Sequence, residues 1–261
     1  MRKETILYVE NVTVSFDGFL ALKDLNFYMG YNELRVVIGP NGAGKSTMLD
    51  VICGRTRPVK GRVIFGKDEL SITKMSEHGI VQLGIGRKFQ TPSLFTNLPV
   101  HANFELSLRK NRGVFSTLFA KLTSEDDDKI HEILEMVGLV EKRHEMAGSL
   151  SHGEKQWVEL GMVLSQDPQL LLLDEPVAGM SIEETDETAK IINRIAESLG
   201  NKSIVVIDHD MDFVEKIARK VSVLHDGTLL CEGTFKEVQR DERVIEKYLG
   251  REKGKEEESK T

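Results

Sequence analysis

Long apolar runs are missing from this 261-residue sequence. The longest uninterrupted runs hold four residues, whereas a membrane-spanning helix needs about 20. The start of the chain also lacks the apolar stretch of a secretory signal. We therefore expect a chain that does not cross a membrane by itself and that lies in the cytoplasm.

Cysteine is scarce, and the histidines are scattered. The two cysteines, Cys53 and Cys231, lack Cys-x-x-Cys spacing, so we expect two buried thiols in a reducing compartment and no disulfide. None of the seven histidines has a second histidine at the spacing of a zinc-binding helix, and no structural metal is expected. The net charge of −7 disfavours a broad contact with nucleic acid.

The run GPNGAGKST at positions 39–47 follows the apolar residues 36–38 and matches G-x-x-x-x-G-K-[S/T]. Its three glycines let backbone N–H groups turn inward around a polyphosphate. In such a loop Lys45 reaches the β- and γ-phosphates, Ser46 offers a hydroxyl to Mg²⁺, and the next helix points its N-terminus at the anion. A glycine-rich turn is the alternative, and the flanking strand and helix favour the phosphate-binding loop.

A pair of carboxylates follows the four leucines at 170–173. A continuous apolar run is typical of a central parallel strand covered on both faces, and ligands bind at the carboxyl ends of such strands. Asp174 can hold Mg²⁺ through water, and Glu175 can orient or deprotonate an attacking water. A purely structural role is the weaker interpretation because uncompensated burial of charge is costly.

Four other residues have both a functional and a structural interpretation. Ser151 begins a predicted helix, either as a second anion site or as an ordinary N-cap, and the N-cap is preferred without context. His209 lies just past the end of a buried strand predicted over Lys202–Ile207 and either contacts a phosphate or is structural. Phe16 and Phe19 flank a turn and either stack on a base or pack in the core, and taken alone core packing is preferred.

The order of the predicted elements indicates an α/β fold with a mostly parallel sheet. Alternating residues between 5 and 27 predict an antiparallel N-terminal β subdomain. Helical periodicity over approximately 91–165 predicts an inserted helical subdomain. We expect a single domain over residues 1–250 and a charged, disordered tail over residues 251–261.

Local signals also predict where some helices begin and end. Helical character is predicted over Ile72–His78. Ser124 is the predicted N-cap of the helix that Gly138 ends, because three aspartates and a glutamate fill its first turn. A single helix over Phe235–Leu249 is predicted to close the chain before the tail.

Together and in this order, the motifs resemble the ATPase subunits of ABC transporters from about residue 7 to residue 250. The resemblance covers seven places: 39–47 with the Walker A motif, Gln90 with the Q-loop, 150–156 with the signature motif, 170–174 with the Walker B strand, Glu175 with the catalytic glutamate, His209 with the switch histidine and Phe16 with the adenine-stacking aromatic.

This resemblance implies an α/β core of the P-loop NTPase (RecA-like) type and an enzyme that binds ATP and Mg²⁺ and hydrolyses ATP. The implied catalytic residues are Glu175, His209 and Gln90. The implied ATP-binding residues are Phe16, Gly39, Asn41, Gly42, Gly44, Lys45, Ser46 and Thr47. The implied Mg²⁺ ligands are Ser46, Gln90 and Asp174. The implied signature residues, which would face ATP bound to a second subunit, are Ser151, Gly153 and Glu154.

Several positions depart from the usual family pattern. His152 stands where the signature has its first glycine, and Glu154 where it often has glutamine. The γ-phosphate contact would therefore rest on Ser151 and the amide around Gly153. Met180-Ser181 replaces a common Leu-Asp in the loop that serves communication between the two ATP sites, and Asp208 replaces the more usual residue before the histidine.

Within the superfamily, residues 84–95 and the ending 232–250 resemble the ATPases of branched-chain amino-acid and related importers. Residues 153–157, 175–180 and 209–211 look closest to the urea and short-chain amide members. The implied function is an importer ATPase that powers uptake of urea or short-chain amides through separate permease subunits. A branched-chain amino-acid importer is the alternative.

The resemblance also implies partners and a place in the cell. Integral-membrane permease subunits would bind the chain, which would pair with a second copy or a homologous ATPase subunit. A solute receptor would act indirectly through the permease, no nucleic acid is implied, and the chain would be peripheral on the cytoplasmic face of the inner or plasma membrane.

A soluble ABC ATPase of ribosomes or DNA is less favoured because tandem cassettes and long basic inserts are missing. A P-loop small-molecule kinase leaves residues 150–156 unexplained.

Overall fold

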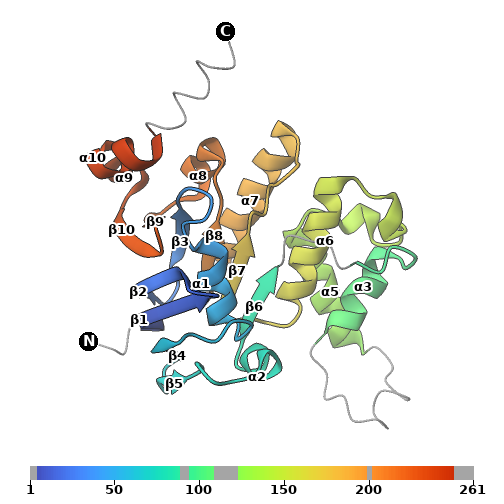
Figure 1. Ribbon diagram of the computed structural model, residues 1–261. Helices are drawn as coiled ribbons and strands as arrows, with labels where there is room; N and C mark the ends of the chain where they lie inside the picture. Colours follow the sequence, from blue (N-terminus) through green and yellow to red (C-terminus); the bar gives the residue numbers. More distant parts are fainter. Residues whose placement is uncertain (1–4, 89–93, 109–122, 199–201, 250–261) are drawn as a thin grey trace.

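The computed structural model describes residues 5–88, 94–108, 123–198 and 202–249. Within these residues the strands form two sheets (Figure 1). The first contains β1 (Thr5–Phe16), β2 (Phe19–Gly30), β4 (Lys60–Phe65) and β5 (Leu70–Ser71) in the order β2-β1-β4-β5. The second contains β3 (Leu34–Ile38), β6 (Ile85–Lys88), β7 (Leu170–Asp174), β8 (Ser203–Ile207), β9 (Lys220–His225) and β10 (Thr228–Gly233) in the order β10-β9-β3-β8-β7-β6.

Helices surround the second sheet. The described α-helices are α1 (Lys45–Ile52), α2 (Glu77–Gln82), α3 (Val100–Ser107), α5 (Ser124–Met136), α6 (His152–Leu164), α7 (Ile182–Ser198), α8 (Met211–Ile217), α9 (Phe235–Arg240) and α10 (Glu242–Val244). Two 3₁₀ helices, η2 (Val140–Lys142) and η3 (Ala147–Ser149), and a π-helix, η4 (Ile245–Leu249), complete the described elements. No helix among the described residues is both long and apolar enough to cross a bilayer.

The first sheet is the predicted antiparallel N-terminal sheet. Strand β1 pairs antiparallel with β2 on one side and with β4 on the other. Asp17 and Gly18 connect β1 to β2 with φ angles of 48° and 88°, which suits a tight hairpin whose twist matches that of the strands. The turn places Phe16 opposite Phe19 at the tip of the hairpin.

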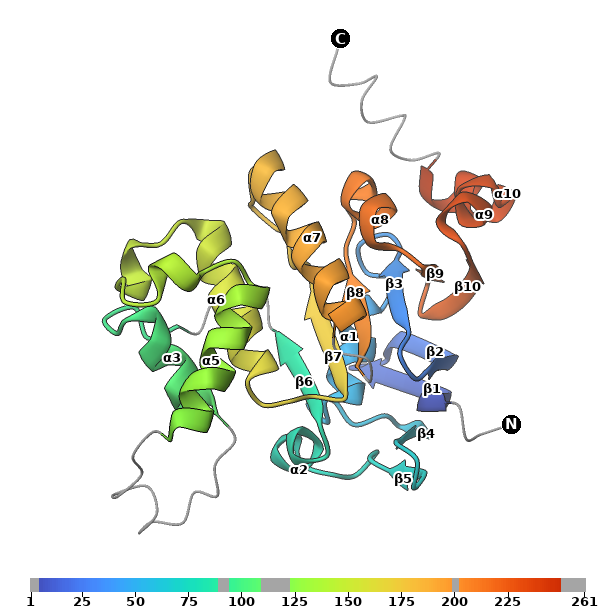
Figure 2. The same ribbon diagram turned by 180° about the vertical axis from the view of Figure 1, so that it is seen from behind.

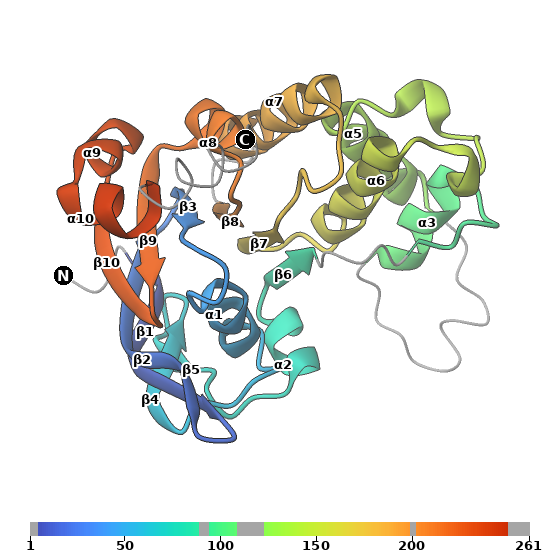
Figure 3. The same ribbon diagram turned by 45° about the horizontal axis from the view of Figure 1, so that its top comes forward.

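The second sheet has a parallel core. Strands β3, β6, β7 and β8 pair in parallel, β9 is parallel to β3, and only β10 is antiparallel among the described strands of this sheet. Alternate residues face opposite sides: Val37 and Leu172 pack with α1 and the N-terminal sheet, whereas Val36 and Leu173 pack with α7 and α8. Burial on both faces explains the unbroken apolar runs in the sequence. Figure 3 shows α1 between the N-terminal strands and β6, and Figure 2 shows α7 and α8 across the opposite face.

Helices α3, α5 and α6 group beside β6 (Figure 1). A Cβ on Gly161 of α6 would lie 2.3 Å from Cε1 of Phe104 in α3, so glycine permits this close approach. A buried polar contact joins the group to the sheet, because Lys88 of β6 donates to Gln156 and lies 3.7 Å from the Glu159 carboxylate. The described part of the predicted insert is thus helical, while the limits of the domain, of the insert and of the tail remain predictions.

Three predicted helix boundaries are wrong because capping residues set them elsewhere. The helix expected over Ile72–His78 begins at Glu77, where the Ser76 hydroxyl accepts the Gly79 N–H. Thr123, not Ser124, caps α5 in a reciprocal capping box with Asp126. The helix expected over Phe235–Leu249 is interrupted at Asp241, whose extended backbone caps a new turn.

The two cysteines differ in their surroundings. Both thiols are free, as expected, but only Cys53 is buried, and Cys231 is partly exposed. The expectation that both are buried is therefore wrong for Cys231. Burial raises the pKa of both thiols to about 11, so both stay protonated near neutral pH.

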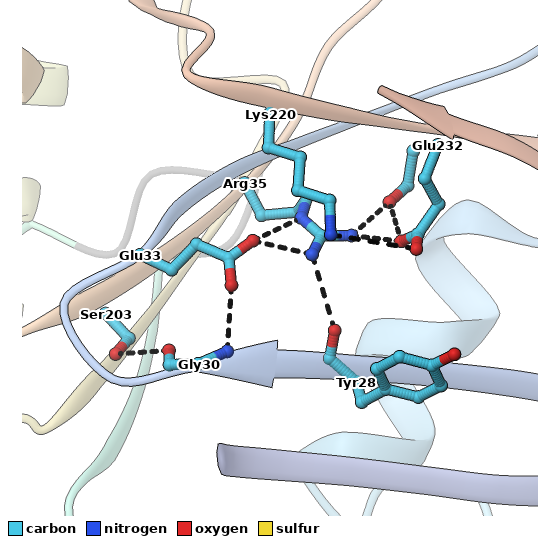
Figure 4. A network of polar contacts seen from close by, with 8 residues as sticks. Tyr28, Gly30, Glu33, Arg35, Ser203, Lys220 and Glu232 are labelled. Atoms are coloured by element: carbon cyan, nitrogen blue, oxygen red, sulfur yellow. Dashed lines mark hydrogen bonds and ion pairs between the residues drawn. The ribbon is translucent and has the colours of Figure 1, made fainter. Parts of the chain in front are cut away.

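A buried arginine connects the two sheets at the N-terminal end of β3. The side chain of Arg35 is only 1% exposed and lies 2.6 Å from a Glu33 carboxylate oxygen. It also donates to Ser222 at 2.6 Å and forms an ion pair with Glu232. Figure 4 shows Glu33 and Glu232 converging on the guanidinium, with the carbonyl of Tyr28 in β2 below it. The network thereby connects strands of both sheets at the end of β3 opposite the phosphate loop.

Candidate active site

The loop 39–47 joins the end of β3 to the start of α1 in close contact with its neighbours. Gly44 caps α1 with a φ of 96°, and a Cβ there would lie 2.7 Å from the Ala21 carbonyl oxygen and from a methyl group of Leu22. A Cβ on Gly39 would lie 2.1 Å from the Leu224 carbonyl oxygen. Only glycine therefore fits at both positions, and the loop backbone is held against β2 and β9.

Lys45 lies under this loop as a buried cation. Its ammonium group donates to the Gly39 carbonyl at 2.6 Å and to the Pro40 carbonyl at 3.1 Å. Burial lowers the pKa of Lys45, and the charges of the site carboxylates oppose that shift; these carboxylates belong to Glu175, Asp174 and Asp208. The ammonium is thus held between the loop and the carboxyl ends of β7 and β8.

Ser46 and Asp174 present the oxygen ligands that Mg²⁺ prefers. The Ser46 hydroxyl lies 3.5 Å from Oδ1 of Asp174, the last residue of β7. Burial raises the pKa of Asp174, and the Arg87 guanidinium, which lies 2.8 Å from its Oδ2, opposes that shift. A hydroxyl and a carboxylate at this spacing fit a magnesium ion, whereas the third predicted ligand, Gln90, lies outside the described residues.

Glu175 follows β7 in an unusual backbone conformation. Its φ of 46° is left-handed, its N–H donates to the Ile207 carbonyl at 2.8 Å, and its Oε1 lies 3.6 Å from Nδ1 of His209. Left-handed backbone at a non-glycine residue costs about 1–3 kcal/mol and gathers at functional sites. The structure therefore brings together Glu175 and His209, two predicted site residues that are 34 positions apart.

Asp208 shapes the loop that carries His209. One carboxylate oxygen accepts the N–H groups of His209 at 2.8 Å and Asp210 at 3.0 Å, whereas the other is buried with no hydrogen-bond partner among the described residues. Burial raises the pKa of Asp208, and these backbone hydrogen bonds oppose the shift. The residue that the sequence marks only as a departure thus fixes the histidine loop.

Phe16 and Phe19 do not pack in the core. Their side chains are 48% and 66% exposed, so the core-packing interpretation is wrong for both. The hairpin that carries them continues into Ala21, against which α1 begins. Both residues therefore lie open to solvent at the end of the hairpin whose Ala21 lies against the phosphate loop.

Ser151 caps α6 as predicted, and its helix start already holds an anion from the same chain. Glu184 of α7 accepts the Ser151 hydroxyl at 2.8 Å and the Gly153 N–H at 3.1 Å, while Glu154 completes a capping box with Ser151. Hydrogen bonds from the Ser181 N–H and the Ser151 hydroxyl lower the pKa of Glu184. The structure is thus compatible with both interpretations of Ser151, as an N-cap and as part of an anion site, because the start of α6 is capped and also binds a carboxylate.

Sequence reasoning missed Glu184 and Arg87. Residues 84–90 predict a short strand, and a charged arginine within that strand is a signal for Arg87. Glu184 is one of several acidic residues at the start of a helix and carries no such signal.

Comparison with known proteins identifies this arrangement. A family model described as ABC transporter matches residues 22–178, which is more than half of the chain. The chain belongs to the ABC transporter family. A second model, described as branched-chain amino acid ATP-binding cassette transporter, matches residues 228–254. The protein is therefore an ATPase, an ATP-binding cassette of the branched-chain amino-acid importer type.

Relatives of the cassette are similar over nearly their full length. The high-affinity branched-chain amino acid transport ATP-binding protein LivG of Escherichia coli (strain K12) is 31% identical over 95% of this chain and 98% of its own. BraF of Pseudomonas aeruginosa, with the same description, is 32% identical over 94% of this chain and 98% of its own. These names agree with the alternative expectation for the solute better than with urea or short-chain amides.

Solved structures confirm the predicted fold. A nucleotide-free ATP-binding cassette from an ABC transporter superposes with a TM-score of 0.80, at 29% identity over 94% of this chain and 98% of its own. An ADP-bound cassette gives a TM-score of 0.80 at 30% identity, over 94% and 99% of the two chains. A dimeric cassette bound to ADP and phosphate gives 0.73 at 25% identity, over 88% and 99%. Nucleotide binding therefore belongs to this fold.

Replacing Gly44 with alanine should destabilise the nucleotide-free cassette more than the same change at Gly18. Both glycines have φ near 90°, but a Cβ at Gly18 meets nothing within 4 Å, whereas one at Gly44 meets a backbone carbonyl at 2.7 Å. We expect Gly18→Ala to cost about 1 kcal/mol and Gly44→Ala at least about 2 kcal/mol more. Urea denaturation followed by circular dichroism measures both, and equal losses would contradict the close approach at Gly44.

Proposed function

We propose that this cassette forms a head-to-tail dimer in which each of two ATP molecules lies between residues 39–47 of one subunit and the start of α6 of the other. The start of α6 carries the proposal, because the Ser151 hydroxyl and the Gly153 N–H already bind a carboxylate oxygen. A phosphate oxygen needs the same donors. The partner is a second copy or a homologous ATPase.

The proposed roles follow the sequence expectations. We assign ATP binding to Phe16, Gly39, Asn41, Gly42, Gly44, Lys45, Ser46 and Thr47. We assign catalysis to Glu175, His209 and Gln90, and the contacts across the dimer to Ser151, Gly153 and Glu154. The open position of Phe16, the burial of Lys45 and the 3.6 Å between Glu175 and His209 support the assignments on the described residues.

Hydrolysis would be an in-line attack of water on the γ-phosphate. Glu175 would orient this water and accept its proton, while Lys45 and His209 would bind γ-phosphate oxygens. Mg²⁺, held by Ser46, Asp174 and Gln90, would supply charge stabilisation at the phosphates. Losing one such transition-state contact costs about 2.7–4 kcal/mol, or 10²–10³ in rate, so a monomer that lacks the partner's Ser151 should hydrolyse ATP slowly.

We propose that the transported solute is a branched-chain amino acid. The printed names of the relatives and the match of residues 228–254 support this alternative over urea or short-chain amides. The solute would bind a receptor and cross through permease subunits, to which this chain would bind peripherally on the cytoplasmic face of the inner or plasma membrane. The choice can be tested by expressing this chain with the products of the neighbouring genes and measuring solute uptake in the presence of leucine or urea as competitor. Inhibition of uptake by urea alone would overturn the proposal.

The substitution Glu175→Gln tests the proposed dimer and the catalytic role together. The amide keeps the shape of the side chain and cannot accept a proton, so we expect ATP binding within about threefold of wild type and a kcat lower by at least about 100-fold. With hydrolysis blocked, ATP should also convert the monomer into a dimer in sedimentation experiments. A variant that binds ATP and hydrolyses it at the wild-type rate would exclude Glu175 as the base.

Glu184 occupies the donors that the partner's ATP would need. Dimer closure must therefore break its hydrogen bonds to Ser151 and Gly153 and move its charge away from the incoming phosphate. The contact of Glu184 with Ser181 can remain, because it uses the other carboxylate oxygen, at 3.1 Å. We propose that the free energy needed to displace the carboxylate by phosphate raises the ATP concentration at which the dimer forms.

The change Glu184→Gln should lower that ATP concentration. The amide oxygen still accepts from the Ser151 hydroxyl and the Gly153 N–H, whereas the amide nitrogen that replaces the other oxygen cannot accept from the Ser181 N–H. The bonds to Ser151 and Gly153 lose their charge assistance and weaken by about 1 kcal/mol, which corresponds to roughly fivefold. Sedimentation in a Glu175→Gln background measures the ATP concentration at half dimerisation. Glu183→Gln is the matched control, since this neighbour is exposed. A higher ATP requirement in the Glu184 variant would show that the carboxylate supports the interface instead.

A further inference from the structure

Arg87 connects three elements of the nucleotide site through one buried guanidinium. It lies in β6 with a side chain that is 6% exposed. Its Nη1 lies 2.6 Å from Oδ1 of Asp50, and its Nη2 lies 2.8 Å from Oδ2 of Asp174. Asp50 belongs to α1, the helix that starts at the phosphate loop, and Asp174 ends β7. The arginine therefore bridges the helix after the loop and the strand that carries the magnesium-binding carboxylate.

The bridge divides the two oxygens of Asp174 between two tasks. Oδ2 accepts from Arg87, and Oδ1 faces the Ser46 hydroxyl at 3.5 Å. The terminal torsion of an aspartate side chain is soft, so an unrestrained carboxylate samples a broad range of rotations. The guanidinium plane is fixed by two carboxylates, because Nη1 binds Asp50 while Nη2 binds Oδ2 of Asp174. Its bond to Oδ2 restricts that rotation, which the single ammonium group of a lysine does less well. The oxygen that remains is directed at Ser46.

We propose that Arg87 is a positioning residue for ATP hydrolysis. It holds the carboxylate of Asp174 in the rotation that presents Oδ1 beside Ser46. Its second bond, to Asp50, fixes the position of the guanidinium, and through it of the Asp174 carboxylate, relative to α1. The proposal rests on the proposed roles of Ser46 and Asp174 as magnesium ligands. Arg87 itself touches neither nucleotide nor metal in this account and acts through Asp174.

The competing explanation is that Arg87 only balances the charge of buried acids. The two explanations predict opposite effects on metal binding. Removing a cation beside Asp174 strengthens the attraction of a divalent ion if charge is the main effect. If orientation is the main effect, the same change weakens metal binding, because the carboxylate no longer faces Ser46.

The test is Mn²⁺ binding to the ADP-bound cassette, followed by electron paramagnetic resonance. We expect Arg87→Met to raise the Mn²⁺ concentration at half saturation about tenfold and to lower kcat about 10- to 100-fold, with KM for ATP changed less than about threefold. Arg87→Lys keeps the charge without the fork and should fall between Met and wild type. Asp50→Asn, which leaves the pair with Asp174, should give a smaller loss in the same direction. Unchanged or tighter Mn²⁺ binding in Arg87→Met would overturn the proposal.

Arg35→Met is the matched control. Arg35 is another buried arginine between two carboxylates, but it lies at the far end of β3. This variant should lose stability to urea with Mn²⁺ binding and KM unchanged. If Arg87→Met does not fold, Arg87→Lys and Asp50→Asn carry the test, and wild-type Mn²⁺ binding in both would overturn the proposal. Asp174→Asn distinguishes a failure of the proposed magnesium ligands from a failure of the role of Arg87. If this variant binds Mn²⁺ normally, the proposed ligand set is wrong. If it binds Mn²⁺ weakly while the Arg87 variants bind normally, only the role of Arg87 is refuted.

Discussion

The buried ammonium group of Lys45 is the charge around which the site is arranged. It is bonded to the carbonyls of Gly39 and Pro40 beneath the loop, and the carboxylates of Glu175, Asp174 and Asp208 act on it from the ends of β7 and β8. Such an arrangement depends on a parallel sheet, which brings the carboxyl ends of separate strands to one edge. The double-faced core and the tight glycine contacts of the loop hold that edge in place.

The sequence predicts the parts of this site that are encoded locally. The loop 39–47, the leucine strand with its two carboxylates and the capped start of α6 each depend on residue types within a few positions, and the structure contains all three elements. The predicted helix boundaries that failed were also local, but at Ser76, Thr123 and Asp241 more than one residue nearby could serve as the cap.

Contacts between distant residues were beyond sequence reasoning. Arg87 meets Asp50 and Asp174 only because β6, α1 and β7 pack together, and Glu184 meets Ser151 only because α7 begins beside α6. Neither pairing has a periodic or spacing signal. The exposure of Phe16 depends likewise on where the hairpin ends relative to the core, which no pattern within β1 specifies. The roles of all these residues in catalysis stay predictions.

The central claim is that each ATP site takes its loop from one subunit and its signature residues from the other. Mixing two inactive variants, Lys45→Ala and Ser151→Arg, tests this claim most directly. Ser151 is exposed, so its position has room for the larger side chain. In a mixed dimer, one site contains both substitutions and the other contains neither. Random pairing in an equal mixture makes about half of the dimers mixed, and each of these has one intact site of two, so the mixture should recover roughly a quarter of the wild-type ATPase rate. A mixture no more active than the two variants measured apart would contradict the claim.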